Sequence, residues 1–378
     1  MLTSKRFTKA SASLLILLFT AGLLIGGLGF YYITYMQVNS LNSKVSNLQS
    51  EVSNLIGFQN ATYQNITILQ NGTSLASIYQ GVRDSVVLVE GDISDGTQQG
   101  SGFVYAFEGR DVVLTNYHVV QGTSSLSVTF SDGKGYSATV LGTDPYSDLA
   151  VVSVNNAQAS EFKPVEIVSS STLNVGESVI AIGNPYGLIG SLTTGAVSAL
   201  GRTITEDTAG GFAIANIIQT STPINPGNSG GPLLNAVGNV VGITTAIVSN
   251  SQGLGFAIPS NTILREISAL VTTGTYRGHS YLGVTGEDMD YGIAQQTGAS
   301  VTYGWKIATI VSGGPSDGKL NVGDIIIALD NQTIRNNDDL ASFLEEHTLP
   351  GDSLVLTVVR GNTHQNVNVI LQERPAPT

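Results

Sequence analysis

Cysteine is absent from this sequence of 378 residues, and histidine is scarce. Without cysteine, the chain forms no disulfide, no thiolate nucleophile, no iron–sulfur cluster and no cysteine-based zinc site. Its four histidines, His118, His279, His347 and His364, lie too far apart in the sequence for a His-x-x-x-His metal pair. We therefore predict an activity that needs no metal and no cofactor.

Charge is also sparse, and it has the wrong sign for binding phosphates. Lys and Arg total 16 against 28 Asp and Glu, for a net charge of −12, so no nucleic-acid partner is expected. Charged residues make up 12% of the chain and hydrophobic ones 42%, which is too apolar for disorder. The 44 glycines favour β structure with tight turns, over a length typical of two or three domains.

The first forty residues predict a membrane anchor. Lys5, Arg6 and Lys9 precede the uncharged run Leu14–Tyr35, which as a helix is long enough to cross about 30 Å of hydrocarbon. The basic flank should stay in the cytoplasm, so the rest of the chain is expected outside the cell membrane. A cleaved signal peptide is the alternative.

A polar stalk follows the expected anchor. Hydrophobic residues recur there in steps of three and four, the a/d pattern of a short coiled coil: Val38, Leu41, Val45, Leu48, Val52 and Leu55. Valine at a and leucine at d favour two strands, but so short a seam does not fix the number of associated chains. A solvated spacer helix or coil is the alternative, because Asn and Ser fill the other positions and form helices poorly.

From about Ser85 to Pro259 the sequence predicts short strands separated by turn residues. The expected strands are Val86–Val89, Gly102–Ala106, Val112–Thr115, Leu126–Phe130, Leu149–Val154, Ser178–Ile182, Ala215–Gln219 and Val240–Thr245. A helix is expected only after them, at Asn261–Val271. Strands without intervening helices indicate antiparallel barrels or sandwiches, so the predicted fold class is mainly β.

The segment Asn225–Pro232 predicts a nucleophilic serine. Ser229 stands among glycines, which permit a sharp turn and the close approach of a substrate carbonyl. The amides of Gly227, Asn228 and Ser229 are candidates for an oxyanion hole. The segment also matches the G-x-S-x-G elbow of α/β-hydrolases, but that fold needs Asp and His after Ser and alternating strands and helices. A plain Gly/Ser turn is the remaining alternative.

Chain order assigns the other members of a catalytic triad. His118 is the only histidine before Ser229, and it ends an apolar strand that could hold it rigidly as a general base. The candidate aspartates between the two are Asp132, Asp144, Asp148 and Asp207. Asp148 is favoured because it directly precedes the apolar strand Leu149–Val154, where a carboxylate needs a partner. Asp144, which begins a turn, is second.

Five segments in this order resemble the HtrA (Deg) family of serine proteases. They are Thr115-Asn-Tyr-His-Val, Asp144-Pro-Tyr-Ser-Asp-Leu-Ala-Val, Gly183-Asn-Pro-Tyr-Gly, Gln219-Thr-Ser-Thr-Pro-Ile-Asn-Pro-Gly-Asn-Ser-Gly-Gly-Pro-Leu and Gly255-Phe-Ala-Ile-Pro. The resemblance implies a chymotrypsin-like fold of two six-stranded β-barrels. It further implies an enzyme that cleaves unfolded or damaged proteins without a cofactor. It also implies the triad His118, Asp148 and Ser229.

The resemblance has further implications. It places Ile224, Thr245 and Ala246 at a pocket for small aliphatic side chains, and trimers are the family habit. Family members switch between inactive and active arrangements, so the Gly-rich stretches around Gly187–Leu192 and Thr203–Gly211 are candidate switch loops. The family's usual Thr-Asp-Ala-Ala-Ile-Asn stretch reads Thr220-Ser-Thr-Pro-Ile-Asn here.

The last hundred residues resemble a PDZ domain of the kind that HtrA proteases carry. The matching segments are Arg277-Gly-His-Ser-Tyr-Leu-Gly-Val, Leu320-Asn-Val-Gly-Asp-Ile and Pro350-Gly-Asp-Ser-Leu. A capped helix is expected at Asn337–His347. The resemblance implies that peptide C-termini bind beside Tyr281, Leu282, Gly283 and Val284. A module that only packs on the protease is the alternative, and His279, His347 and His364 are expected in solvent.

These expectations divide the chain into five parts. We predict a cytoplasmic tail (1–13), a transmembrane anchor (14–35), a stalk (36–74), a trypsin-like protease domain (75–272) and a PDZ domain (273–378). The predicted function is that of a membrane-anchored serine endopeptidase facing outward. A non-catalytic chaperone or tethering scaffold is the alternative.

Overall fold

The computed structural model describes residues 17–23, 28, 34–41, 43–45, 74–184, 190–205, 213–225, 227–245 and 254–376. The chain divides into two units, residues 1–68 and 69–378. In the first unit the described residues are helical, and no helix built from them is long and apolar enough to span a membrane. Residues 17–23, 28, 34 and 35 of the expected span Leu14–Tyr35 are described, as are Val38, Leu41 and Val45 of the expected coiled coil. The rest of both lies outside the described residues, so both stay predictions.

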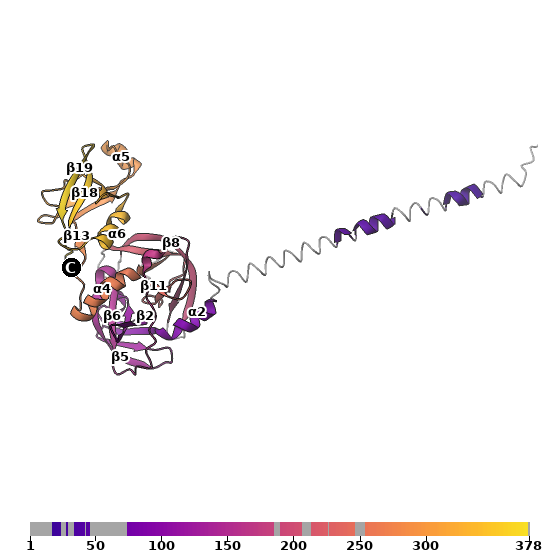
Figure 1. The fold of residues 1–378 in the computed structure, drawn as a ribbon, viewed down its shortest axis with the longest axis horizontal. Coiled ribbons are helices and arrows are strands. Elements are labelled where there is room, and N and C mark those ends of the chain that lie inside the picture. Colours follow the sequence, from indigo (N-terminus) through magenta and orange to yellow (C-terminus); the bar gives the residue numbers. More distant parts are fainter. Residues whose placement is uncertain are drawn as a thin grey trace, which may run out of the picture. The chain divides into compact units, whose positions relative to one another are not determined.

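The second unit begins with a closed six-stranded barrel (Figure 1), whose strands follow the order β1-β2-β3-β6-β5-β4. The elements are α2 (Leu75–Val82), η1 (Arg83–Ser85), β1 (Val86–Ile93), β2 (Gly96–Phe107), β3 (Arg110–Thr115), α3 (Tyr117–Val120), β4 (Ser125–Thr129), β5 (Gly135–Asp144), η2 (Pro145–Ser147) and β6 (Leu149–Val154). All of its strand pairs are antiparallel.

A second closed barrel follows, in the order β10-β11-β12-β9-β8-β7. Its elements are η3 (Ser170–Thr172), β7 (Ser178–Gly183), β8 (Ser191–Thr205), β9 (Ala213–Thr220), β10 (Pro232–Leu234), β11 (Val240–Thr245), β12 (Gly255–Pro259) and the helix α4 (Ser260–Thr273). The two barrels confirm the prediction of antiparallel β architecture.

One hydrophobic cluster spans both barrels, in addition to a core cluster inside each of them. Phe103 and Leu114 of the first barrel and Ile180 and Ile243 of the second are fully buried in the same cluster. Helix α4 adds its apolar face to this cluster through residues such as Ile263. Burial of this apolar surface is the main force that fixes the barrels relative to each other.

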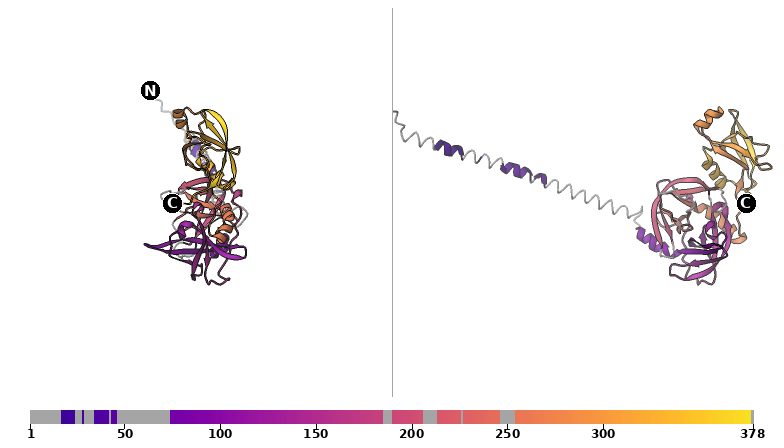
Figure 2. Two further views of the ribbon diagram at one scale, coloured as in Figure 1. Left: turned by 90° about the vertical axis from the view of Figure 1, so that its left-hand side faces the viewer. Right: turned by 180° about the vertical axis from the view of Figure 1, so that it is seen from behind.

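The C-terminal domain is a separate sheet with two helices, drawn in orange and yellow in Figures 1 and 2. Its main sheet runs β14-β15-β16-β18-β19, with β17 beside β16, and β13 pairs with β20. The elements are β13 (Ser280–Tyr281), β14 (Val284–Asp288), α5 (Tyr291–Thr297), β15 (Trp305–Ile310), β16 (Ile325–Leu329), β17 (Gln332–Thr333), α6 (Asn337–His347), β18 (Ser353–Arg360), β19 (Thr363–Ile370) and β20 (Gln372–Glu373). Helix α6 has the predicted bounds because the Asn336 side chain caps it, accepting from the Asp339 amide at 2.9 Å.

A cluster of charged side chains, some buried and some partly exposed, connects the C-terminal domain to the barrels. This junction cluster consists of Asp144 on β5, Arg265 and Glu266 on α4, His279 before β13, and Glu345 on α6. His279 is 5% exposed; its Nε2 lies 2.5 Å from Asp144 Oδ2 and its Nδ1 lies 3.0 Å from Glu345 Oε2. The prediction that His279 lies in solvent is therefore wrong, because carboxylates from both domains enclose it.

The junction cluster should make stability depend on pH. Burial lowers the pKa of His279, but the hydrogen bonds that its ring donates to Asp144 and Glu345 outweigh it and raise the pKa to about 10, from 6.5. The contribution of His279 to the free energy of unfolding is therefore complete below pH 6.5 and disappears as the pH rises towards 10. We expect a loss on the order of 3 kcal/mol across this window, measured by urea unfolding. The His279→Ala variant should lose this slope; an unchanged slope would contradict the assignment.

Candidate active site

His118 is positioned by the end of a buried strand. Strand β3 delivers Thr115, buried Asn116 follows, and His118 sits in the one-turn helix α3. The ring Nδ1 lies 2.9 Å from Asp148 Oδ2 and 3.0 Å from Asp148 Oδ1. The backbone N–H of His118 also donates to Asp148 Oδ1 at 2.9 Å. One carboxylate thus fixes both the ring and the backbone of the histidine.

Asp148 is fully buried, between the turn η2 and strand β6. Its carboxylate also accepts a hydrogen bond from Thr245 Oγ1 of β11, at 3.1 Å from Oδ2. Its carbonyl accepts from the Tyr117 amide at 3.1 Å and from Asn116 Nδ2 at 3.0 Å. Donors from both barrels therefore converge on Asp148, as a buried polar group requires. The structure pairs Asp148, and not the runner-up Asp144, with His118.

The hydroxyl of Thr245 is a testable part of this arrangement. The Thr245→Val variant keeps the shape of the side chain and removes one donor to Asp148, at a cost of about 1–2 kcal/mol in transition-state stabilisation. We expect kcat/KM for a peptide substrate to fall about tenfold. The Thr245→Ser variant keeps the hydroxyl and should stay within about twofold of the parent; equal losses in both variants would show that packing is responsible.

Ser229 lies in a turn that contacts the first barrel. Gly227 and Gly230 have φ angles of 96° and 86°, a left-handed conformation that glycine adopts at little cost. The Ser101 amide donates to the Ser229 carbonyl at 2.7 Å, and Ser101 Oγ donates to the Gly227 carbonyl at 2.6 Å. A Cβ atom on Gly230 would meet Thr115 Oγ1 at 2.4 Å, so the turn lies against the end of β3, just before His118.

Hydrogen bonding within the same turn decides which amides remain available for the predicted oxyanion hole. The Asn228 amide donates to the Asn225 carbonyl at 2.9 Å, which closes a reverse turn. That amide is therefore engaged within the turn, and the oxyanion role of Gly227 and Ser229 stays a prediction.

The three residues predicted for the specificity pocket have different surroundings. Ile224 is half-buried against the second barrel's core. The Thr245 hydroxyl is directed to Asp148, a contact that sequence reasoning missed because the two residues are 97 positions apart. Ala246 lies outside the described residues. The pocket assignment therefore stays a prediction.

The four residues predicted to bind peptides line one cavity. Tyr281, Leu282, Gly283 and Val284 line a cavity of about 210 Å³ together with α6, which contributes Leu340, Ala341, Leu344 and Glu345. The cavity, called the groove below, also touches Ala213 and Ala215 of β9 in the second barrel. An extended peptide could add to the edge of the sheet here.

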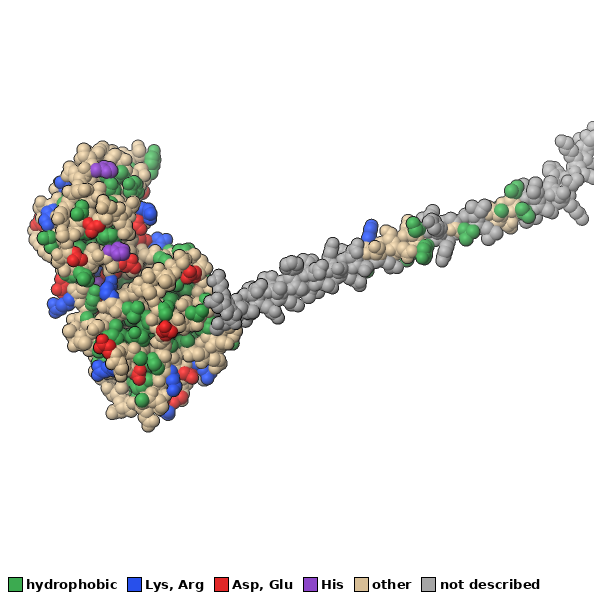
Figure 3. Space-filling model, in the orientation of Figure 1, with side chains coloured by type: hydrophobic (Ala, Val, Ile, Leu, Met, Phe, Trp, Pro, Cys, Tyr) green, Lys and Arg blue, Asp and Glu red, His purple; other side chains and the backbone are tan. Residues whose placement is uncertain are grey.

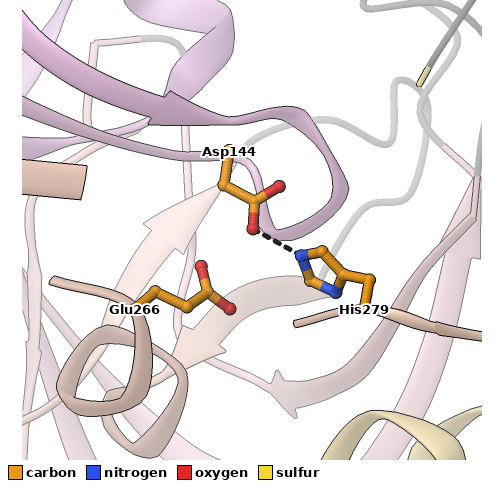
Figure 4. A group of neighbouring side chains, drawn as sticks. All are labelled: Asp144, Glu266 and His279. Carbon is orange, nitrogen blue, oxygen red and sulfur yellow. Dashed lines mark hydrogen bonds and ion pairs between the residues drawn. The ribbon is translucent and has the colours of Figure 1, made fainter. Parts of the chain in front are cut away.

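One group of side chains has the composition of a metal site. Asp144, Glu266 and His279 are buried, and one ligand atom from each lies within 4.8 Å of the others, as Figure 4 shows. His279 Nε2 is already in contact with Asp144 Oδ2, which accounts for that nitrogen without an ion.

On the face drawn in Figure 3, acidic and basic side chains are interspersed among the described residues and form no continuous basic stripe.

The comparisons with known proteins agree with this architecture. Residues 100–243 match the family model of a trypsin-like peptidase domain, and residues 280–371 match that of a PDZ domain. The chain is 35% identical over 302 residues to the serine protease Do-like HtrA of Bacillus subtilis, covering 76% of this chain and 67% of that protein. It is 37% identical over 282 residues to a probable periplasmic serine endoprotease DegP-like of Chlamydia muridarum, covering 74% of this chain and 54% of that protein. The chain thus spans between half and two thirds of the length of these relatives.

Solved structures give the same result. The HtrA-type protease AlgW with tripeptide has a TM-score of 0.65 at 30% identity, covering 81% of this chain and 99% of that chain. The serine endoprotease from Yersinia pestis has a TM-score of 0.58 at 29% identity, covering 80% of this chain and 99% of that chain. With two closed barrels, a C-terminal sheet of matching type and this degree of identity, the chain belongs to the HtrA family of serine proteases and joins a trypsin-like peptidase domain to one PDZ domain.

Proposed function

We propose that this chain is a membrane-anchored endopeptidase that cleaves unfolded or damaged proteins outside the cytoplasm through His118, Asp148 and Ser229. The observation that carries the proposal is the contact of the Asp148 carboxylate with both the ring and the backbone of His118, beside the turn that holds Ser229. A tethering scaffold would need none of these contacts.

The proposed mechanism assigns one role to each side chain. Ser229 Oγ attacks the scissile carbonyl while His118 Nε2 takes its proton, and the Asp148 carboxylate accepts from Nδ1–H and stabilises the imidazolium. The amides of Gly227 and Ser229 stabilise the tetrahedral oxyanion. His118 then protonates the leaving amine, and water hydrolyses the acyl-enzyme. Ile224 contributes to an apolar pocket that favours small aliphatic residues before the cut.

The other parts of the proposal concern location and partners. The basic flank before Leu14–Tyr35 supports a single-pass anchor with both folded domains outside, and relatives named periplasmic proteases support the same side. The a/d pattern of the stalk supports a homo-oligomer, a trimer by family resemblance. The groove supports binding of peptide C-termini. Alkaline extraction of membranes should leave the intact chain bound and release a chain lacking residues 1–35.

Labelling of the full chain by a fluorophosphonate tests the catalytic proposal. We expect labelling of the parent and of the Ser178→Ala variant, whose serine is exposed at the start of β7, and none of Ser229→Ala. Mass spectrometry of a digested unfolded protein should show cuts after small aliphatic residues, absent with Ser229→Ala. Failure to label the parent, with or without peptides that fill the groove, would favour the scaffold.

A further inference from the structure

Strand β2 carries a serine whose polar groups are all used beside the active site. Ser101 is fully buried, and its amide donates to the Ser229 carbonyl at 2.7 Å, in the turn called the serine turn below. Its carbonyl accepts from Thr115 Oγ1 at 2.7 Å, at the end of β3. Its hydroxyl contacts main-chain groups of Gly227 and Asn184. One residue of the first barrel thus contacts both the serine turn and the strand that leads to the catalytic histidine.

Glycines on both sides of Ser101 permit this close approach. A Cβ atom on Gly100 would lie 2.6 Å from the Val119 side chain and 3.1 Å from the Ser229 carbonyl oxygen. A Cβ atom on Gly102 would lie 2.7 Å from a valine side chain of β3. Interiors are packed too densely to accept such distances without a shift. Strand β2 therefore lies this close to the serine turn only because glycines flank Ser101.

The Ser101 hydroxyl acts as both donor and acceptor. It accepts from the amide of Asn184, the residue after β7, at 2.7 Å. It donates to the Gly227 carbonyl at 2.6 Å. The directions of both bonds are fixed, because an amide N–H can only donate and a carbonyl can only accept. The single hydroxyl hydrogen of Ser101 is therefore committed to Gly227.

This bond holds one peptide unit of the serine turn from one side, while a second bond holds it from the other. The unit joins the Gly227 carbonyl to the Asn228 amide, and that amide donates to the Asn225 carbonyl at 2.9 Å. Because a peptide unit is planar, the two bonds together fix its orientation. Gly227 has no side chain to restrict its own rotation, so its carbonyl depends on an outside partner. The unit lies between the peptide units that carry the amides of Gly227 and Ser229, the two proposed oxyanion donors.

We infer that Ser101 is a positioning residue of the active site: its hydroxyl orients the Gly227–Asn228 peptide unit and, with it, the amides of Gly227 and Ser229 that stabilise the oxyanion. This inference rests on the proposed catalytic function. Ser101 acts through the backbone of the serine turn and not on the substrate itself. Without the hydroxyl, the peptide unit keeps only its bond to Asn225 and can rotate, so the two amides no longer point to one spot.

The Ser101→Ala variant of the full chain tests the inference. It keeps the backbone bonds to Ser229 and Thr115 and removes only the hydroxyl. We expect kcat for a peptide substrate to fall about 10- to 30-fold with KM within about twofold, because the oxyanion develops only on the way to the transition state. Ser101→Cys fills the same space with a weaker donor and should show a smaller fall in kcat. A cysteine variant slower than the alanine variant would overturn the role of the hydroxyl.

Ser260→Ala is the matched control for loss of a buried hydroxyl. Ser260, at the start of α4, is also fully buried, and its Oγ donates to the Val168 carbonyl at 2.6 Å. Ser101→Ala and Ser260→Ala should lower the melting temperature by similar amounts, because each leaves one buried carbonyl without its donor. Ser260→Ala should nevertheless keep the parent kcat at temperatures where the fold is intact. Equal kcat losses in the two variants would overturn the inference.

Inhibition by a peptide boronic acid gives a readout that lost stability does not change. The boron atom bonds to the nucleophilic serine oxygen and becomes tetrahedral, so the adduct resembles the transition state and places an oxygen at the oxyanion position. We expect its inhibition constant to rise in Ser101→Ala by about the same factor as kcat/KM falls. An inhibition constant equal to that of the parent would overturn the assignment to the oxyanion amides.

Labelling by a fluorophosphonate distinguishes the two ways in which the inference can fail. If the parent is not labelled, the proposed function fails, and the inference fails with it. If the parent is labelled and Ser101→Ala keeps both the parent labelling rate and the parent kcat, only the present inference fails.

Discussion

The Ser229→Ala variant is expected to lower kcat for peptide hydrolysis by about a million-fold, and His118→Ala by a similar factor. Ser229 supplies the attacking oxygen and His118 the base, so neither is effective without the other. The double variant should therefore be no slower than either single variant. Fluorogenic peptide hydrolysis with highly purified protein measures all three.

The fold should survive the loss of the Ser229 hydroxyl. The contact of this residue with the first barrel uses its backbone carbonyl, which accepts from the Ser101 amide. We expect the melting temperature of Ser229→Ala to stay within about 2 °C of the parent. Multiplicative losses in the double variant would mean that the two side chains act in separate steps, contrary to the proposed triad.

The Gly230→Ala variant should abolish activity and destabilise the fold together. The added Cβ would lie 2.0 Å from the Ser101 carbonyl oxygen and 2.4 Å from Thr115 Oγ1, and the backbone at Gly230 has φ 86°. The serine turn cannot stay in place against backbone atoms at that distance. We expect a loss of about 3 kcal/mol or more in the free energy of unfolding, and fluorophosphonate labelling at least 100-fold slower.

Gly176→Ala is the matched control for backbone strain alone. Gly176 has φ 97°, and a Cβ there would meet no atom within 4 Å. This variant should lose only about 1 kcal/mol and label at the parent rate. If both glycine variants behave alike, strain and not contact with Ser101 explains the effect.

Local sequence patterns were sufficient for the elements that form the site. Strands β6 (Leu149–Val154) and β11 (Val240–Thr245) have the predicted bounds, because each is a short apolar run bordered by turn-forming residues. Chain order then selected His118, and the apolar strand that follows Asp148 favoured this acid over the other aspartates; the structure brings the two residues into contact. The HtrA family assignment made from these motifs is confirmed.

Longer, more polar strands were harder to predict. Strand β8 (Ser191–Thr205) was not predicted, and the two candidate switch loops overlap its ends. Its pairing with β9 contains three register shifts, so inward and outward residues do not alternate regularly along it. A sequence pattern of period two cannot identify such a strand.

The burial of His279 could not be read from its neighbours. Its partners Asp144 and Glu345 are 135 and 66 positions away, and each belongs to a different domain. An isolated histidine in a Gly- and Ser-containing segment gives no local sign that two carboxylates will enclose it. Only the tertiary structure reveals that this linker residue is part of the interior.

Closure of both barrels has a consequence for a proteolytic enzyme. A cleavage site must be drawn out as an extended strand, but nearly every such strand in these barrels already pairs with a neighbour on each side. Self-digestion within the barrel strands must then wait for the barrels to open. The rate of self-digestion should therefore follow the fraction of unfolded molecules. The hydrophobic cluster that fixes the barrels thus also determines how long the enzyme survives digestion by other copies of itself.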